Sequence, residues 1–102
     1  MAHDADTAVL EDVRTTLKAP RPFAVVFHND DATTFEFVCI ALIQFFEKTP
    51  AEAVAFAQSV HTSGRGVAGV YPRQVAEAKQ ALVLQAARAE GHDAFTVTIE
   101  EA

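Results

Sequence analysis

The segment FAVVFHNDDATTFEF, residues 23–37, decides the fold of this chain. From Phe23 to Phe27 it is apolar and alternates larger with smaller side chains, which predicts a largely buried β-strand. The polar residues 28–31 favour a turn. Thr33, followed three residues later by Glu36, predicts a capping box at the start of a helix. The segment therefore predicts a strand, a polar corner and a helix in direct succession.

A second helix signal follows the first helix. Thr49 and Glu52 form another predicted capping box, with Pro50 suited to the first turn, and glycines from Gly64 onward predict the end of this helix. The first helix has an apolar face, formed by Val38, Ala41, Leu42, Phe45 and Phe46. The second helix carries along one side Ala53, Ala57, Val60 and His61.

The rest of the chain predicts a strand at residues 67–71, a helix from Pro72 to about Glu90 that ends at Gly91, and a strand from Phe95 to Ile99. One flank of the last helix carries Val75, Lys79, Leu82, Val83 and Ala86. Three strands cannot cover three helices on both sides. We therefore predict an α+β fold in the order strand-helix-helix-strand-helix-strand, with three helices packed on one face of a three-stranded antiparallel sheet.

Length and composition limit the possible classes of protein. At 102 residues the chain suffices for one core, and we expect a flexible N-terminal tail at residues 1–22 and one domain at residues 23–102. No apolar run reaches the roughly 20 residues of a membrane helix, and a secretion signal is missing. A net charge of −6 with scattered basic residues argues against nucleic-acid binding. The single cysteine, Cys39, fits a reducing cytoplasm. We find no cysteine cluster and no Gly-rich phosphate loop, and expect neither a metal nor a cofactor.

Four side chains offer hydrogen-bond acceptors around the polar corner. Asn29 offers an amide oxygen, Asp30 and Asp31 offer carboxylates, and a neutral His61 offers one ring nitrogen. This set suits an ammonium group, whose three donors need three acceptors when water is removed. Two plainer interpretations stay open, because Asn and Asp are ordinary turn residues and a single His is commonly a satisfied core or surface residue. Spacing alone does not show whether the four side chains meet.

Short matches to a known family run in order and without gaps from the polar corner to the end of the chain. They are Asn29-Asp30-Asp31, Glu36-Phe37-Val38, Phe45-Phe46, Val60-His61, Gly64, Gly66-Val67, Gly69-Val70-Tyr71, Val75-Ala76-Glu77, Lys79 and Thr98-Ile99-Glu100-Glu101-Ala102. On these residues the chain resembles the ClpS family, the adaptors that deliver proteins with destabilising N-terminal residues to AAA+ Clp proteases. The resemblance implies the fold predicted above, and an adaptor that is not an enzyme.

The resemblance also implies a substrate site. Asn29, Asp31 and His61 would bind the free α-amino group of a substrate that begins with Leu, Phe, Tyr or Trp, and Asp30 would shape an acidic rim. The cavity for the first side chain would be lined by Thr33, Val38 and Val60.

Three cavity positions depart from the family pattern. The family usually has a gating Met preceded by Pro, and this chain has Thr34 and Phe35 there. We expect the stiffer ring of Phe35 to narrow the entrance, although simple core packing of this ring stays open. Ala57 and Ala94 stand at cavity positions where the family usually has larger apolar residues. The sequence therefore leaves open which N-terminal residue of the substrate is preferred.

The implied partner is the N-terminal domain of a Clp-type AAA+ unfoldase. Glu77 and Lys79, near the start of the third helix, match residues that contact this domain in the family. Pro72 and Gln74 differ from the family there, which leaves the identity of the unfoldase open. The tail, residues 1–22, would help to pass substrate to the unfoldase.

Two other classes of protein compete with this interpretation. One is a metal-dependent hydrolase that uses Asp30, Asp31 and His61, although paired His spacing and a separate general base are missing. The other is a structural protein-interaction module without N-degron binding.

Overall fold

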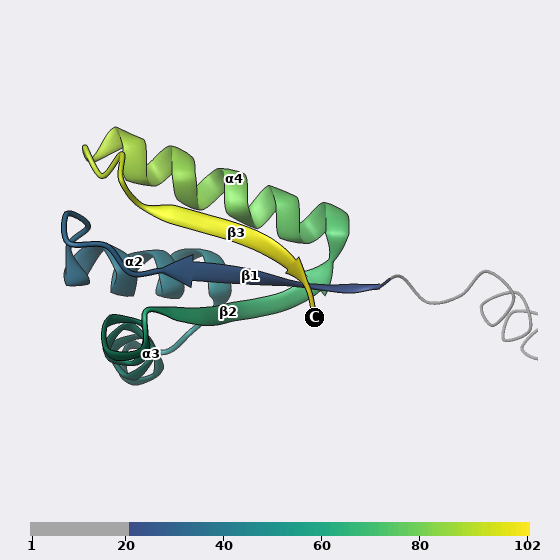
Figure 1. The fold of residues 1–102 in the computed structure, drawn as a ribbon, viewed down its shortest axis with the longest axis horizontal. Helices are drawn as coiled ribbons and strands as arrows, with labels where there is room; N and C mark the ends of the chain where they lie inside the picture. Colours follow the sequence, from purple (N-terminus) through teal and green to yellow (C-terminus); the bar gives the residue numbers. More distant parts are fainter. Residues whose placement is uncertain (1–20) are drawn as a thin grey trace, which may run out of the picture.

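A computed structural model describes residues 21–102, so most of the predicted tail lies outside the described residues. Within these residues, three strands and three helices follow one another in the predicted order, which confirms the fold class; Figure 1 shows their arrangement. The elements are β1 (Pro22–His28), α2 (Phe35–Phe46), α3 (Pro50–Ser63), β2 (Arg65–Pro72), α4 (Arg73–Ala89) and β3 (Thr96–Glu101). Among these elements, no helix combines the length and the apolar character needed to cross a membrane.

The sheet is antiparallel, with β1 in the centre and the order β2-β1-β3. The register of β1 with β2 shifts next to Val26, which pairs with Val67 and leaves Ala68 as the extra residue of a bulge. The bulge turns the side chain of Ala68 into the core, while Val67 stays half exposed on the face of the sheet away from the helices.

The helices share the other face of the sheet. In Figure 1, α4 runs along β3 and β1, α3 lies beside the start of β2, and α2 packs against both helices. Phe27 of β1 is fully buried at the centre of this layer. Its ring meets three others edge to face, those of Phe46 at 5.4 Å, Phe56 at 6.0 Å and Phe95 at 5.1 Å. The central strand therefore anchors α2, α3 and the start of β3.

The start of α2 differs from the predicted capping box. Thr34 is the cap, since its hydroxyl oxygen accepts a hydrogen bond from the amide of Phe37 at 3.1 Å. The hydroxyl of Thr33 instead donates to the carboxylate of Asp30 at 2.7 Å. The predicted pairing of Thr33 with Glu36 is therefore wrong, because a nearer carboxylate holds the Thr33 side chain.

The predicted start of α3 and the predicted end of α4 are confirmed. The amide of Thr49 donates to the carboxylate of Glu52 at 2.9 Å, and the amide of Glu52 donates to the Thr49 hydroxyl at 3.2 Å. After α4, Gly91 adopts the left-handed conformation with φ of 79°, which a glycine adopts without steric cost.

The face that α4 turns to the sheet is made of small residues. Ala76, Val83 and Ala87 are buried, whereas Val75 and Leu82 of the predicted flank are 41% and 47% exposed. Small side chains let α4 lie close to the sheet, and the larger Leu84 packs at the edge of the core.

Candidate functional site

A cavity of about 330 Å³ lies where β1 ends and α2 begins. All the predicted substrate-site residues except Ala94 line it, together with two that were not predicted. The lining residues are His28, Asn29, Asp30, Asp31, Thr33, Phe35, Val38, Ala57, Val60, His61 and Phe95. The structure therefore brings together the polar corner and the end of α3, which sequence spacing could not show.

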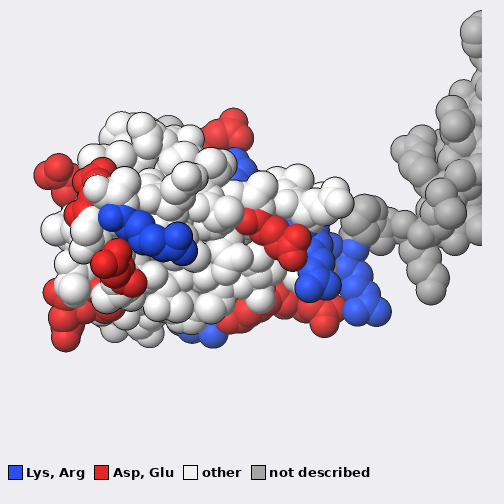
Figure 2. Space-filling view, turned by 90° about the horizontal axis from the view of Figure 1, so that it is seen from above, with Lys and Arg blue, Asp and Glu red and all other residues white. Residues whose placement is uncertain are grey.

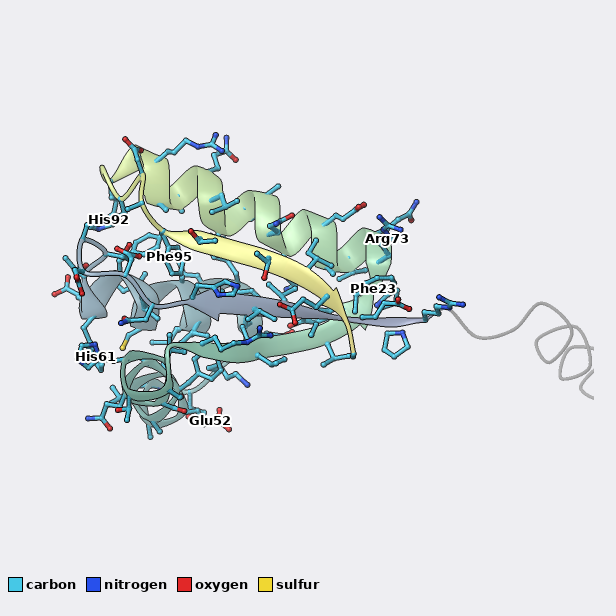
Figure 3. All side chains as sticks on the ribbon, viewed as in Figure 1. Phe23, Glu52, His61, Arg73, His92 and Phe95 are labelled. Carbon is cyan, nitrogen blue, oxygen red and sulfur yellow. The ribbon has the colours of Figure 1, made fainter. Side chains whose placement is uncertain are left out.

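A backbone hydrogen bond joins the two halves of the site. The amide of Asn29 donates to the carbonyl oxygen of Gly64 at 2.9 Å, and Gly64 is the residue that ends α3. His61 lies one turn earlier on α3, so this bond brings its ring to the polar corner. In Figure 3, His61 lies at the end of the molecule opposite Phe23 and Arg73.

Asp30 stabilises the loop between β1 and α2. Its carboxylate accepts hydrogen bonds from the amides of Ala32 at 2.8 Å and Thr33 at 2.7 Å, and from the Thr33 hydroxyl at 2.7 Å. Burial raises the pKa of Asp30, but these bonds and the charge of His92 outweigh it, and the net pKa is lowered. Asp30 therefore acts on the shape of the site through the loop.

Asn29, Asp31 and His61 form the polar mouth of the cavity. All three are exposed, and within residues 21–102 the structure gives their side chains no hydrogen-bond partner. The lining contains no Lys or Arg, and acidic side chains are prominent at this end of the molecule, on the left in Figure 2. The mouth therefore presents acceptors to a ligand that brings positive charge and several donors.

The inner part of the cavity is apolar. Ala57, Val60 and Phe95 are nearly buried, and Val38 is half-buried. Phe35 is the first residue of α2, is 46% exposed and still lines the cavity, so it belongs to the entrance and is not a core residue. The site therefore combines polar acceptors at its mouth with apolar surface inside.

The predicted cavity residue Ala94 is exposed and lies outside the lining, and its neighbour Phe95 takes that place. The alternation of Phe95 with Val97 along the last strand could have identified Phe95, because it puts both on the core side. His28 was also missed. Its ring forms a hydrogen bond with the Thr98 hydroxyl at 2.7 Å, a contact between neighbouring strands that are far apart in the sequence, so no local pattern predicts it.

The two predicted partner residues on α4 differ in their surroundings. Glu77 is exposed. Lys79 is half-buried, and its ammonium donates to the carbonyl oxygen of Phe45 at the end of α2, above the rings of Phe46 and Tyr71. Lys79 therefore ties α4 to α2, whereas Glu77 stays at the surface, where its carboxylate pairs with Arg73 at 3.4 Å.

Within residues 21–102, no group of three or more His, Cys, Asp and Glu side chains is arranged to hold a metal ion. Asp30, Asp31 and His61, the ligands of the hydrolase hypothesis, are not arranged as such a group. The carboxylate of Asp30 is also occupied by its three hydrogen bonds.

Comparison with known families and proteins agrees with the geometry. The family described as "ATP-dependent Clp protease adaptor protein ClpS" matches residues 18–98. A protein of that name from Nitratidesulfovibrio vulgaris, strain Miyazaki F, is 46% identical over 96 residues, which cover 94% of this chain and 93% of the relative. A ClpS adapter from Deinococcus radiodurans is 49% identical over 79 residues, which cover 78% of this chain and 70% of that protein.

A solved structure has the same arrangement of elements. Agrobacterium tumefaciens ClpS2 bound to L-phenylalaninamide superimposes with a TM-score of 0.78 at 26% identity, and the match covers 82% of this chain and all of that one.

Proposed function

The chain belongs to the ClpS family of ATP-dependent Clp protease adaptors, and from this premise we propose that it binds proteins through their N-terminal residue. The proposed ligand is a free α-amino group followed by a bulky apolar side chain, from Leu, Phe, Tyr or Trp. The adaptor then delivers the bound protein to a Clp-type AAA+ unfoldase and has no catalytic step of its own.

The observation that carries this proposal is the two-part cavity. An N-terminal ammonium has three donors and a positive charge, and the mouth offers acceptors on Asn29, Asp31 and His61. The first side chain then enters the apolar part next to Val60 and Phe95, where buried apolar area contributes roughly 25 cal/mol per Å². An internal peptide segment supplies neither the charge nor the donors, so the mouth selects chain ends.

The solved relative supports the same assignment. Its ligand, L-phenylalaninamide, has a free α-amino group and an aromatic side chain, and the amide stands where a peptide would continue. A cavity of about 330 Å³ with polar groups at its opening suits such a ligand in this chain.

Delivery requires a second surface. We assign Glu77, on the exposed side of α4, to the contact with the N-terminal domain of the unfoldase. We assign residues 1–22, most of which lie outside the described residues, to the transfer of substrate. An adaptor of an ATP-dependent protease works where that protease works, and we place this one in the cytoplasm.

One titration tests the proposed function. A fluorescent peptide that begins with Phe should bind, and the same peptide with an acetylated N-terminus should bind at least about 30-fold more weakly. Acetylation removes the charge and leaves acceptors unpaired, a loss on the order of 2–5 kcal/mol. Equal anisotropy curves for both peptides would exclude recognition of the amine. Absence of binding by both would favour the structural interaction module.

A further inference from the structure

Phe95 forms the inner wall of the cavity, and its ring is held on two sides. It is 5% exposed, and its centroid lies 5.1 Å from the ring of Phe27 and 5.9 Å from that of Phe37. Both contacts are edge to face, with interplanar angles of 84° and 83°. A ring between two such neighbours cannot turn away when a ligand enters.

The two supporting rings are themselves fixed. Phe27 is fully buried among further aromatic rings. Phe37 is 4% exposed and lies against the ring of His92 at 5.1 Å. In Figure 3, His92 and Phe95 lie near each other at the end of the molecule that carries the cavity. The wall formed by Phe95 is therefore preorganised. Because its side chain is already fixed, ligand binding loses little conformational entropy there.

The other apolar walls are aliphatic. Val38 and Val60 offer branched side chains, and Ala57, which is 4% exposed, offers one methyl group. Aromatic surface thus reaches the cavity from Phe95 inside and from Phe35 at the entrance. A small residue at Ala57 leaves room for a flat ring beside Phe95.

We propose that Phe95 determines specificity, and that the site binds aromatic N-terminal residues more tightly than Leu. This inference rests on the proposed function and names the preferred ligands of the same site. Aromatic pairs gain interaction beyond their buried area, and a gain of about 1 kcal/mol corresponds to about fivefold in affinity.

The first measurement uses the unaltered protein and three peptides that differ only at residue one: Phe, cyclohexylalanine and Leu. Cyclohexylalanine keeps the six-membered outline of Phe but lacks the aromatic electrons. We expect Phe to bind about fivefold more tightly than Leu and several-fold more tightly than cyclohexylalanine. If Phe and cyclohexylalanine bind equally, the aromatic preference is wrong, while the proposed function stands because the peptides bind.

The second measurement repeats the titrations on Phe95→Leu and on Phe56→Leu as a matched control. Phe56 also contacts the ring of Phe27, at 6.0 Å, but does not line the cavity. We expect Phe95→Leu to bring the ratio of Phe to Leu affinity close to one, and Phe56→Leu to leave it unchanged. A ratio that persists in folded Phe95→Leu overturns the assignment to Phe95.

If Phe95→Leu does not fold, the cyclohexylalanine comparison still decides the aromatic preference. Failure of every peptide to bind the unaltered protein defeats the proposed function itself.

Discussion

The polar side chains near the two ends of α2 differ in whether they have a hydrogen-bond partner within the described residues. At its start, Asn29, Asp31 and His61 are exposed around a cavity, without a side-chain hydrogen-bond partner in residues 21–102. At its end, the ammonium of Lys79 donates to the carbonyl oxygen of Phe45. A polar group with an internal partner contributes to folding, whereas the exposed acceptors around the cavity can exchange water for a ligand. The comparison therefore separates residues of the fold from residues of the site.

Removal of the Asp31 charge should have the largest effect of the changes considered, and on binding alone. We expect Asp31→Asn to weaken the binding of a Phe-initiated peptide by at least about 30-fold, because the ammonium loses its charged acceptor. The free energy of unfolding should change by less than about 0.5 kcal/mol, since no described internal contact is lost. Anisotropy titration and urea unfolding measure the two quantities.

The control is Asp93→Asn, which removes an exposed carboxylate that does not line the cavity. It should leave peptide affinity within about twofold, as a surface charge change does. If both variants lose the same affinity, the general acidity of this end of the molecule attracts the peptide, and Asp31 makes no direct contact.

Lys79→Met should show the reverse behaviour. The variant keeps the apolar stem but leaves the carbonyl of Phe45 without its charged donor, so we expect a loss of about 2 kcal/mol in unfolding free energy with peptide affinity unchanged. Glu77→Gln is the control, because its carboxylate forms an exposed ion pair with Arg73 at 3.4 Å, and such pairs contribute less than about 0.5 kcal/mol. If Lys79→Met is fully stable but no longer binds the unfoldase, Lys79 contacts the partner, as the sequence predicted, and does not stabilise the fold.

The same comparison explains which features the sequence could predict. The strands, the capping box at Thr49 and the glycine end of α4 depend on neighbours in the chain, and these predictions are confirmed. The cap at Thr34 was missed because Asp30 competes for the hydroxyl of Thr33. The contact of Lys79 with α2 and the bond between His28 and Thr98 depend on distant segments, so no local pattern carries them.

More of the residues that line the candidate site could be predicted than of the contacts that hold them in place. The polar corner and His61 line the cavity as expected, and their chemistry is visible in the sequence and matches the family. Ala94 was predicted to line the cavity, but Phe95 lines it, and the two are neighbours just before β3, where consecutive side chains point to opposite sides. Asp30 was assigned to the rim, and only the structure shows that three hydrogen bonds engage it in the loop.

Phe35 provides a smaller test at the entrance. At the end of α2, the ammonium of Lys79 covers the ring of Tyr71. At its start, the ring of Phe35 is half exposed beside the cavity, where a ligand can contact it. Val and Ile branch at Cβ, next to the amine, and would meet this ring first. We expect weak binding of Val- and Ile-initiated peptides, and a several-fold relative gain for them in Phe35→Ala, on the order of 1 kcal/mol. Ile40→Ala, another exposed apolar change on α2 outside the cavity lining, should give no such gain. If Phe35→Ala lowers the affinity for Leu, Phe, Val and Ile peptides by the same factor, Phe35 lines the cavity without selecting against branched side chains.

The smallest effect concerns Asp30 and acid. Its pKa in the folded protein lies below the ordinary value of 3.8, so its carboxylate stabilises the fold above that pH, and this stability is lost as the pH falls through the folded pKa. Asp30→Asn keeps an oxygen for the amides of Ala32 and Thr33 but cannot titrate. We expect it to flatten the fall in unfolding free energy as the pH drops below about 4, with a difference on the order of 1 kcal/mol. Thr33→Val removes one of the three bonds and should flatten the fall in part. Equal slopes for all three proteins would show that the loop hydrogen bonds to Asp30 do not contribute to folding stability in this pH range.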